Sequence, residues 1–333
     1  MMTDKKKIGI ILVSLIVMLL WGSLFSVVKL GYKQFHIDTA FYPNLLLFAG
    51  IRFSVSGFII VFLRSAKNKF RPLIKTQKEW GGVLLLALFA VIMHYGFTYF
   101  GLSVVASAKT ALLKQSGVIV FIFLSFLIIK EDKFSIFKLF GAVFGIASII
   151  ILNLGENGGG FSIGEIYIVL ASVCTVAAGI VCKKLLSNTD AVMMTGISEL
   201  LGGLLLLIAG LSLGGTLNIA GTGSWLLLLY LIAATCVSYI LWYSVVQKYE
   251  LSKLFIIKLS EPLFAAVIGA VILEENIFNA QYLISFFCVI VAVVISNVNM
   301  IRKTKTQKLM VQDVSELAAS QSSATYMEDT KDK

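Results

Sequence analysis

The chain has 333 residues, of which 58% are hydrophobic and 14% charged, and its formal net charge is +10. A soluble globular chain is about 45–50% apolar and about 25% charged, so this composition excludes an ordinary soluble domain and indicates an integral membrane protein. The positive charge does not indicate nucleic-acid binding, because the basic residues lie in short segments between apolar runs, where they orient the chain in a membrane.

Ten apolar runs follow one another, and each is long enough to cross about 30 Å of hydrocarbon as a helix. The predicted spans are Ile8–Leu30, Tyr42–Leu63, Trp80–Phe100, Val104–Ile129, Phe134–Asn153, Ile163–Leu186, Ala191–Leu213, Ser224–Gln247, Lys253–Leu273 and Ala280–Met300. The first run follows a basic head, residues 1–7, and imitates a secretory signal, but it is too long for a signal core and no cleavage pattern closes it. The tail, residues 301–333, is polar and rich in Ser and Gln, and we expect it to be disordered.

The basic residues predict the orientation of the chain. With the N-terminus inside the cell, lysine and arginine gather in the segments assigned to the cytoplasm, whereas the outer loops hold little beyond Lys33. The sequence therefore predicts a multi-pass protein of the cell (plasma or inner) membrane with both termini cytoplasmic.

The two halves of the chain, residues 8–153 and 162–300, repeat one another. Glu131 and Glu274, which end spans four and nine, are 143 residues apart, and at this offset spans three to five overlay spans eight to ten without a gap. Because each half has an odd number of spans, the second half must be inverted in the membrane. Inverted repeats with a binding site near the membrane midplane are typical of secondary transporters. We therefore predict an all-α integral membrane protein of ten transmembrane helices arranged as two inverted five-helix repeats.

Three motifs resemble those of the EamA-type transporters of the drug/metabolite transporter superfamily. They are Trp21-Gly22-Ser23 with Phe25 and Lys29, the second-span pair Arg52-Phe53, and the ninth-span stretch LSEPLFAAVIGAVILEEN. The resemblance covers nearly all of residues 8–300, and it implies a ten-helix fold of two inverted repeats that moves small organic metabolites, often outward. One departure is that Ile119 stands where the repeat would place the counterpart of Pro262.

The first group of candidate site residues lies in spans four and nine. Span four carries a stripe of small and polar residues with one lysine, at helical spacing: Ser103, Ser107, Thr110, Lys114 and Gly117. Lys114 is too deep to reach either membrane surface, so it either faces a cavity or bonds to a neighbouring helix in a closely packed bundle. In span nine Lys258 and Glu261 are three residues apart and can pair on one face, beside Pro262, or take part in a site.

A second group of candidates lies in the other spans. Arg52 and Glu199 occupy similar depths in spans two and seven, where they form either one structural ion pair or two separate anchors. His94 is either a satisfied packing residue or a proton carrier, and Tyr99 and Trp242 are either interface aromatics or cavity walls. The mid-membrane groups are slightly positive in sum, which favours an anionic group such as a carboxylate or phosphate.

These observations favour a secondary transporter, and more specifically an exporter, of a small carboxylate-bearing metabolite such as an amino acid or derivative. A transporter of a phosphorylated metabolite is the alternative within transport, and an intramembrane enzyme is the alternative from another class. The sequence has no HExxH, GxSxG or Walker motif and no metal-ligand spacing among its cysteines, so we expect neither an enzyme nor a bound cofactor. A proton gradient is one candidate driving force, and the sequence does not indicate the oligomeric state.

Overall fold

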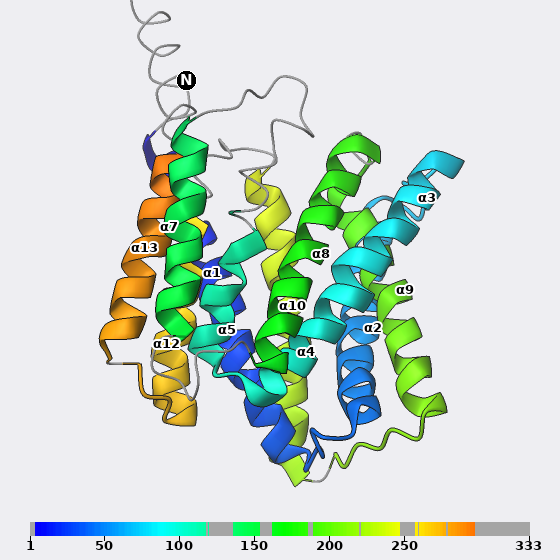
Figure 1. Ribbon diagram of the computed structural model, residues 1–333. Helices are drawn as coiled ribbons and strands as arrows, with labels where there is room; N and C mark the ends of the chain where they lie inside the picture. The colour runs from blue at the N-terminus through cyan, green and yellow to red at the C-terminus, as the bar shows by residue number, and fades with distance from the viewer. Residues whose placement is uncertain are drawn as a thin grey trace, which may run out of the picture.

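The computed structural model describes residues 4–117, 119, 136–153, 162–185, 189–219, 221–246, 257, 258, 260–277 and 279–296. These residues form helices and connecting loops, and no strand occurs among them (Figure 1). The helices are α1 (Asp4–Gln34), α2 (Tyr42–Lys67), α3 (Gln77–Leu86), the π-helical segment η1 (Ala87–Met93), α4 (His94–Val104), α5 (Ser107–Leu113), α7 (Ile136–Asn153), α8 (Ile163–Leu185), α9 (Ala191–Ser212), α10 (Gly221–Val246), α12 (Ser260–Leu273) and α13 (Ala280–Ser296). The predicted disordered tail and, within span four, residues 118 and 120–129 lie outside the described residues.

Five helical stretches are long and apolar enough to cross a membrane: Gly9–Gln34, Tyr42–Lys67, Gln77–Val104, Ala191–Ser212 and Gly221–Trp242. Four shorter apolar helices accompany them, within α7, α8, α12 and α13. Large apolar side chains cover the outside of the bundle, and Phe58, Leu205 and Phe287 are each more than half exposed. A surface of this kind requires lipid in place of water. The prediction of an all-helical integral membrane protein is confirmed.

Local sequence signals account for several helix boundaries. Pro43 lies in the first turn of α2, where the missing N–H of proline costs no hydrogen bond. Thr76 and Glu79 form a capping box at the start of α3, and the Asp190 carboxylate caps α9 by accepting from the N–H of Met193 at 2.8 Å. The predicted third span lies within one helical stretch of 28 residues, Gln77–Val104, which is made of α3, η1 and α4. The π-helical η1 forms the middle of this stretch.

Close helix packing organises the bundle. The most extensive contact joins α2 to α9, and α7–α13, α1–α12, α1–α10 and α4–α8 follow. Glycine permits the α2–α9 approach, because a methyl group at Gly57 or Gly203 would collide with the backbone of the facing helix. In Figure 1, α2, α3 and α9 form one side of the molecule and α7, α12 and α13 the other, with α1, α5, α8 and α10 between them.

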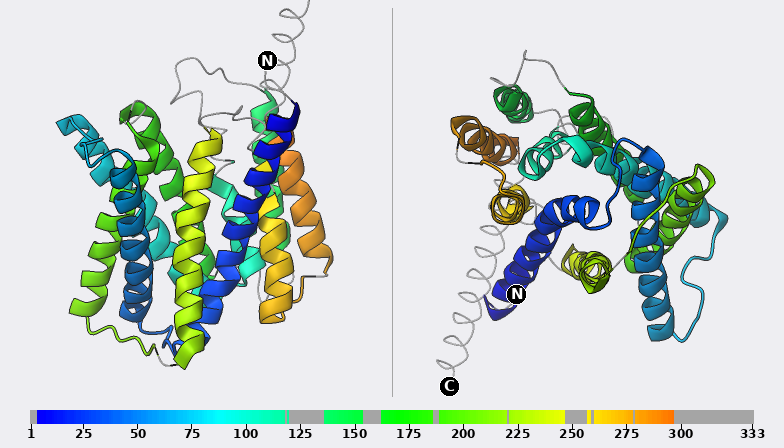
Figure 2. Two further views of the ribbon diagram at one scale, coloured as in Figure 1. Left: turned by 180° about the vertical axis from the view of Figure 1, so that it is seen from behind. Right: turned by 90° about the horizontal axis from the view of Figure 1, so that it is seen from below.

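The N-terminal end of α1 and the C-terminal end of α13 lie at the same end of the bundle (Figure 2). The loop between α12 and α13 and the loop between α9 and α10 lie at the opposite end (Figures 1 and 2). α9 and α10 therefore run in opposite directions, and so do α12 and α13, as in a chain that passes repeatedly through a membrane.

Candidate functional site

A cavity of about 360 Å³ lies between the two sides of the bundle, with walls from α1, α2, α4, α5, α8, α10 and α12. Seven of the eight candidate residues predicted from the sequence line it: Arg52, His94, Tyr99, Lys114, Trp242, Lys258 and Glu261. The eighth, Glu199, is not part of its wall. Residues from both halves of the chain, far apart in sequence, thus meet around one polar space.

Lys114 enters the cavity where α5 ends. It is the C-cap of α5, and its own N–H still donates to Thr110 O at 3.0 Å. Its ammonium group lies 3.2 Å from His94 Nε2 and 5.0 Å from the centroid of the Phe25 ring. A cation over an aromatic face is attracted by the ring quadrupole, but neither neighbour carries a negative charge. Lys114 therefore presents a charge that no carboxylate of the described residues neutralises by direct contact.

His94 holds Lys114 from the opposite wall. It begins α4, directly after the π-helical η1, and its Nδ1 lies 2.8 Å from the carbonyl oxygen of Ala171 on α8. A carbonyl only accepts hydrogen bonds, so Nδ1 carries the proton and Nε2 offers its lone pair to the Lys114 ammonium. The Thr175 hydroxyl, 2.9 Å from Nδ1, completes the contact with α8. His94 is thus hydrogen-bonded like a packing residue and also lines the cavity, and its role as a proton carrier stays a prediction.

Lys258 and Glu261 line the cavity without forming an ion pair. The ion pairs found among the described residues are Lys29–Glu275, Arg64–Asp190 and Lys109–Glu165. Instead the Lys258 ammonium lies 5.8 Å from the centroid of the Trp21 ring. The pairing that the three-residue spacing allows is therefore not formed, and Trp21 lies on α1, which packs against α12.

Arg52 is 2% exposed and is held by neutral partners. Its Nε and one terminal nitrogen donate to Thr235 Oγ1 at 3.0 and 2.7 Å, and its other terminal nitrogen donates to the Tyr99 hydroxyl at 3.0 Å. The structural ion pair that similar depths allow between Arg52 and Glu199 is therefore not formed. Both carboxylate oxygens of Glu199 are buried and have no hydrogen-bond partner among the described residues.

A family model described as the EamA-like transporter family matches residues 7–154 and 162–297. The chain belongs to the EamA-like transporter family. The family model matches this chain twice, once in each half. Family membership makes the chain a multi-pass membrane protein of transporter type and points away from an enzyme.

Known relatives of this EamA-like chain agree with that assignment. A chloroplastic WAT1-related protein of Arabidopsis thaliana is 26% identical over 75% of this chain, but the match covers only 62% of the plant protein's own length. The uncharacterized transporter YoaV of Bacillus subtilis is 24% identical over 82% of this chain and 90% of its own. A crystal structure at 15% identity superposes with a TM-score of 0.61 over 88% of this chain and 98% of its own, which shows a shared fold.

Aromatic side chains form much of the cavity wall in this EamA-like protein. Trp21 packs against Trp242 and Tyr239 with ring centroids 5.2 and 5.8 Å apart, and the hydroxyls of Tyr95 and Tyr239 lie 2.6 Å apart. The sequence analysis did not select Trp21, Tyr95 or Tyr239 as site residues. Helical spacing was a usable signal, because Tyr95 lies one turn before Tyr99 on the same face, and Tyr239 lies one turn before Trp242.

The charges in the cavity wall are unequal. Three basic side chains, those of Arg52, Lys114 and Lys258, and one acidic side chain, that of Glu261, are among the lining residues. None of the three cations forms an ion pair with that carboxylate in the described part of the chain. No group of three or more His, Cys, Asp or Glu that could hold a metal ion occurs among the described residues. The described lining residues therefore carry more basic than acidic side chains.

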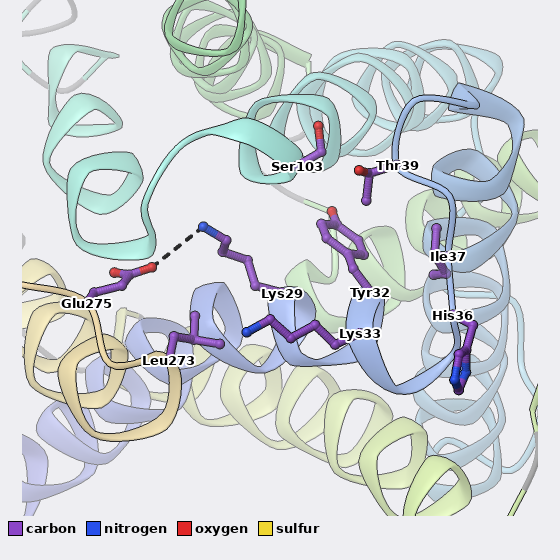
Figure 3. Close-up of a pocket in the computed structure, with 9 residues that line it drawn as sticks. All are labelled: Lys29, Tyr32, Lys33, His36, Ile37, Thr39, Ser103, Leu273 and Glu275. Carbon is purple, nitrogen blue, oxygen red and sulfur yellow. Dashed lines mark ion pairs between the residues drawn. The ribbon is translucent and has the colours of Figure 1, made fainter. Parts of the chain in front are cut away.

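A second cavity, of about 490 Å³, opens near the C-terminal end of α1 (Figure 3). Lys29, Lys33 and Glu275 lie in its wall, and Lys29 forms an ion pair with Glu275 at 3.6 Å. Glu275 also accepts from the N–H groups of Ser107 and Ala108 at 2.7 and 3.2 Å, so the α12–α13 loop is fixed to the start of α5. We take the inner cavity as the candidate substrate site of the transporter, because its charged groups converge and are more deeply buried.

Proposed function

We propose that this protein is a secondary transporter that exports a small, carboxylate-bearing metabolite such as an amino acid or an amino acid derivative. The observation that carries the proposal is the excess of cations in the central cavity, where Arg52, Lys114 and Lys258 face only Glu261. A charge at mid-membrane costs about 2.5–3.5 kcal/mol on the insertion scale, so three unneutralised cations require a compensating function. A bound anion supplies the missing negative charge.

The size and chemistry of the cavity support a small organic anion. Its volume, about 360 Å³, lies at the lower end of the range for small-molecule pockets, about 300–1,000 Å³. The ring faces of Trp21, Tyr95 and Trp242 offer apolar contact for the rest of such a molecule, beside the cations that would bind its carboxylate.

We further propose ten transmembrane helices in two inverted five-helix repeats. Support comes from several helix contacts that recur when each span is exchanged for its counterpart. α2 packs on its counterpart α9, α7 packs on its counterpart α13, and the contact of α1 with α10 is repeated by that of α8 with α4. Superposition of residues 8–153 on residues 163–300 is expected to need a rotation about an axis in the membrane plane. An axis along the membrane normal would contradict the inverted repeat.

Both termini are proposed to lie in the cytoplasm, with the protein in the cell membrane. A reporter fused after Lys303 is expected to behave as cytoplasmic, and one inserted at Gly158–Gly160 as external. The opposite pattern would overturn the orientation.

The transport experiment uses a matched pair of probes. An N-acetylated amino acid and its carboxamide have nearly the same shape, and only the first carries a carboxylate. Purified protein in phosphatidylethanolamine–phosphatidylglycerol vesicles is loaded with either probe, and efflux is followed. We expect selective efflux of the acid, whereas equal efflux of the two probes or faster efflux of the amide would contradict the carboxylate proposal. A sugar phosphate and its parent sugar form a second pair, and selective efflux of the phosphate would favour the phosphorylated class instead.

A further inference from the structure

We infer that Glu199, which does not line the substrate cavity, is a proton-binding site that couples the movement of a proton to that of the substrate anion. This inference rests on the proposed transport of an anion through the central cavity. It assigns a role to a buried acidic group that substrate binding alone leaves unexplained.

The surroundings of Glu199 favour the protonated acid. The residue is 1% exposed, and neither carboxylate oxygen has a hydrogen-bond partner among the described residues. Its backbone lies against Gly57 of α2, in the tightest helix contact of the bundle, so water has little access to it from that side. An ionised carboxylate without donors is very unfavourable in such a place, and the group is neutralised by binding a proton instead.

One cation lies close enough to Glu199 to change the balance between its protonated and ionised forms. The titratable groups that act electrostatically on Glu199 from the helices around it are Arg52 on α2, Tyr95 on α4 and Cys236 on α10. The η1 segment has no titratable residue, and α3 carries Lys78 and Glu79 only in its first turn, at the end of the helix. Arg52 is therefore the cation that responds to a charge on Glu199.

Arg52 connects the two sites because it also lines the substrate cavity. While Glu199 holds its proton, the Arg52 guanidinium remains bound to Thr235 and Tyr99 and keeps its charge in the cavity wall. When Glu199 releases the proton to water, the new carboxylate attracts Arg52 away from these neutral partners, and the cavity becomes less positive. A proton on Glu199 and an anion in the cavity thus strengthen each other's binding, by the same factor in both directions.

The consequence is that one proton travels with the anion, in the same direction. Net export then follows whenever the outward gradient of the substrate exceeds the inward gradient of protons. The proton and the anion are carried together, in the state in which both are bound. This coupling also explains why the Glu199 carboxylate lies behind Arg52, the cation that lines the substrate cavity.

Two measurements test the inference on the full chain in lipid vesicles. Infrared difference spectra at stepped pH should show the C=O band of a buried carboxylic acid that disappears at alkaline pH. The band should be absent from Glu199→Gln and shifted in Glu199→Asp. It should remain in Glu275→Gln, the control, because the Glu275 carboxylate lies outside the surroundings of Glu199 and accepts two backbone N–H bonds. A wild-type spectrum without a band that Glu199→Gln removes would overturn the proton site. Gel filtration and thermal unfolding establish that each variant is folded.

The second measurement follows proton movement with a pH-sensitive dye trapped in the vesicles, during flux of the N-acetylated amino acid. The wild type should carry protons with the acid, and Glu199→Gln should carry the acid with at least a tenfold smaller proton flux. Equal proton flux per anion in the two proteins would overturn the coupling. If no anionic probe moves at all, the proposed function fails, whereas the infrared band still decides whether Glu199 binds a proton.

Discussion

Two lysines of the short helix α5 illustrate how one helix carries a structural charge and a functional one. Lys109 is 4% exposed and forms an ion pair with Glu165 in the first turn of α8. Lys114, at the other end of the helix, faces the central cavity, and within the described part of the chain its ammonium group lies near a histidine and an aromatic ring. Both lysines are expensive to place inside a membrane, yet only the cost of Lys109 is offset within the protein itself.

The difference teaches that the role of a buried charge depends on its partner and not on its depth. A charge beside an opposite charge stabilises the fold, whereas a charge without such a partner is available for function. Glu165 caps its own helix by accepting from the N–H of Ser162 at 2.9 Å, so the Lys109–Glu165 pair fixes the start of α8 against α5. Lys114 has no such carboxylate, and the positive charge it leaves in the cavity is available to a ligand. Removing the charge of Lys109 should therefore lower stability, whereas removing the charge of Lys114 should lower transport.

Lys109→Met should have the largest effect, and it should be on stability. The substitution leaves the Glu165 carboxylate buried without its cation, and breaking a buried pair in this way costs about 3–5 kcal/mol. We expect a strong loss of folded protein and a lower thermal midpoint in detergent. The double variant Lys109→Met/Glu165→Gln serves as the control, because it removes both charges and should recover most of the loss. No recovery would show that the pair itself is not the source of the stability.

Lys114→Met should lower transport without a comparable loss of stability. Methionine keeps the length and the apolar stem of lysine, while a charge-assisted hydrogen bond to a substrate, about 1.5–3 kcal/mol, disappears. This corresponds to roughly a 10- to 100-fold weaker apparent affinity for the N-acetylated amino acid. Thermal unfolding close to that of the wild type is the matched observation. Wild-type transport by this variant would remove Lys114 from the site.

Lys258→Met should reduce anion transport by a smaller factor, about 5- to 10-fold. The Lys258 ammonium already interacts with the Trp21 ring, so part of its attraction for an anion is offset before substrate binds. Trp21→Leu removes the ring and should affect the amide and acid probes alike. A loss for Lys258→Met that is equally large for both probes would show that Lys258 supports packing instead of binding charge.

Asp190→Asn should have the smallest effect, and it should depend on pH. Partial burial would raise the pKa of the Asp190 carboxyl, but hydrogen bonds from Arg64 and from the Met193 N–H outweigh it and hold that pKa below its usual value. A lowered folded-state pKa stabilises the protein above the unfolded-state pKa, about 3.9, and this contribution fades as the pH falls through the folded-state value. Asparagine still caps a helix, so the loss at neutral pH should be about 1 kcal/mol and should vanish in acid. A loss that is independent of pH would rule out the ion pair as its cause.

The sequence was sufficient for the helical membrane fold, because long apolar runs have few other stable structures in lipid. Most of the charged cavity residues could also be predicted from the sequence, because a charge deep in an apolar run needs a partner or a polar space. Features that depend on tertiary packing could not be predicted from the sequence. Arg52 and Glu199 lie at similar depths, but only Arg52 lines the cavity, because the helix face that each residue presents depends on how α2 and α9 pack.

Other features of the site had no local signal. Lys109 and Glu165 belong to different helices and different halves of the chain, so their pairing follows from the packing of α5 on α8. Lys258 meets Trp21 for the same reason, although Glu261 is the nearer partner in sequence. The π-helical η1 before His94 replaces a helix that hydrophobic periodicity predicts as regular.

The most direct test of the cation-rich site is the ratio of efflux for the N-acetylated amino acid and its carboxamide, measured for the wild type and for Lys114→Met/Lys258→Met in the same vesicles. The two lysines supply the charge that distinguishes these probes, so the ratio should exceed one in the wild type and fall at least tenfold in the double variant. Efflux of the amide should change little. An unchanged ratio, or an equal loss for both probes in a folded double variant, would contradict an anion site in the central cavity.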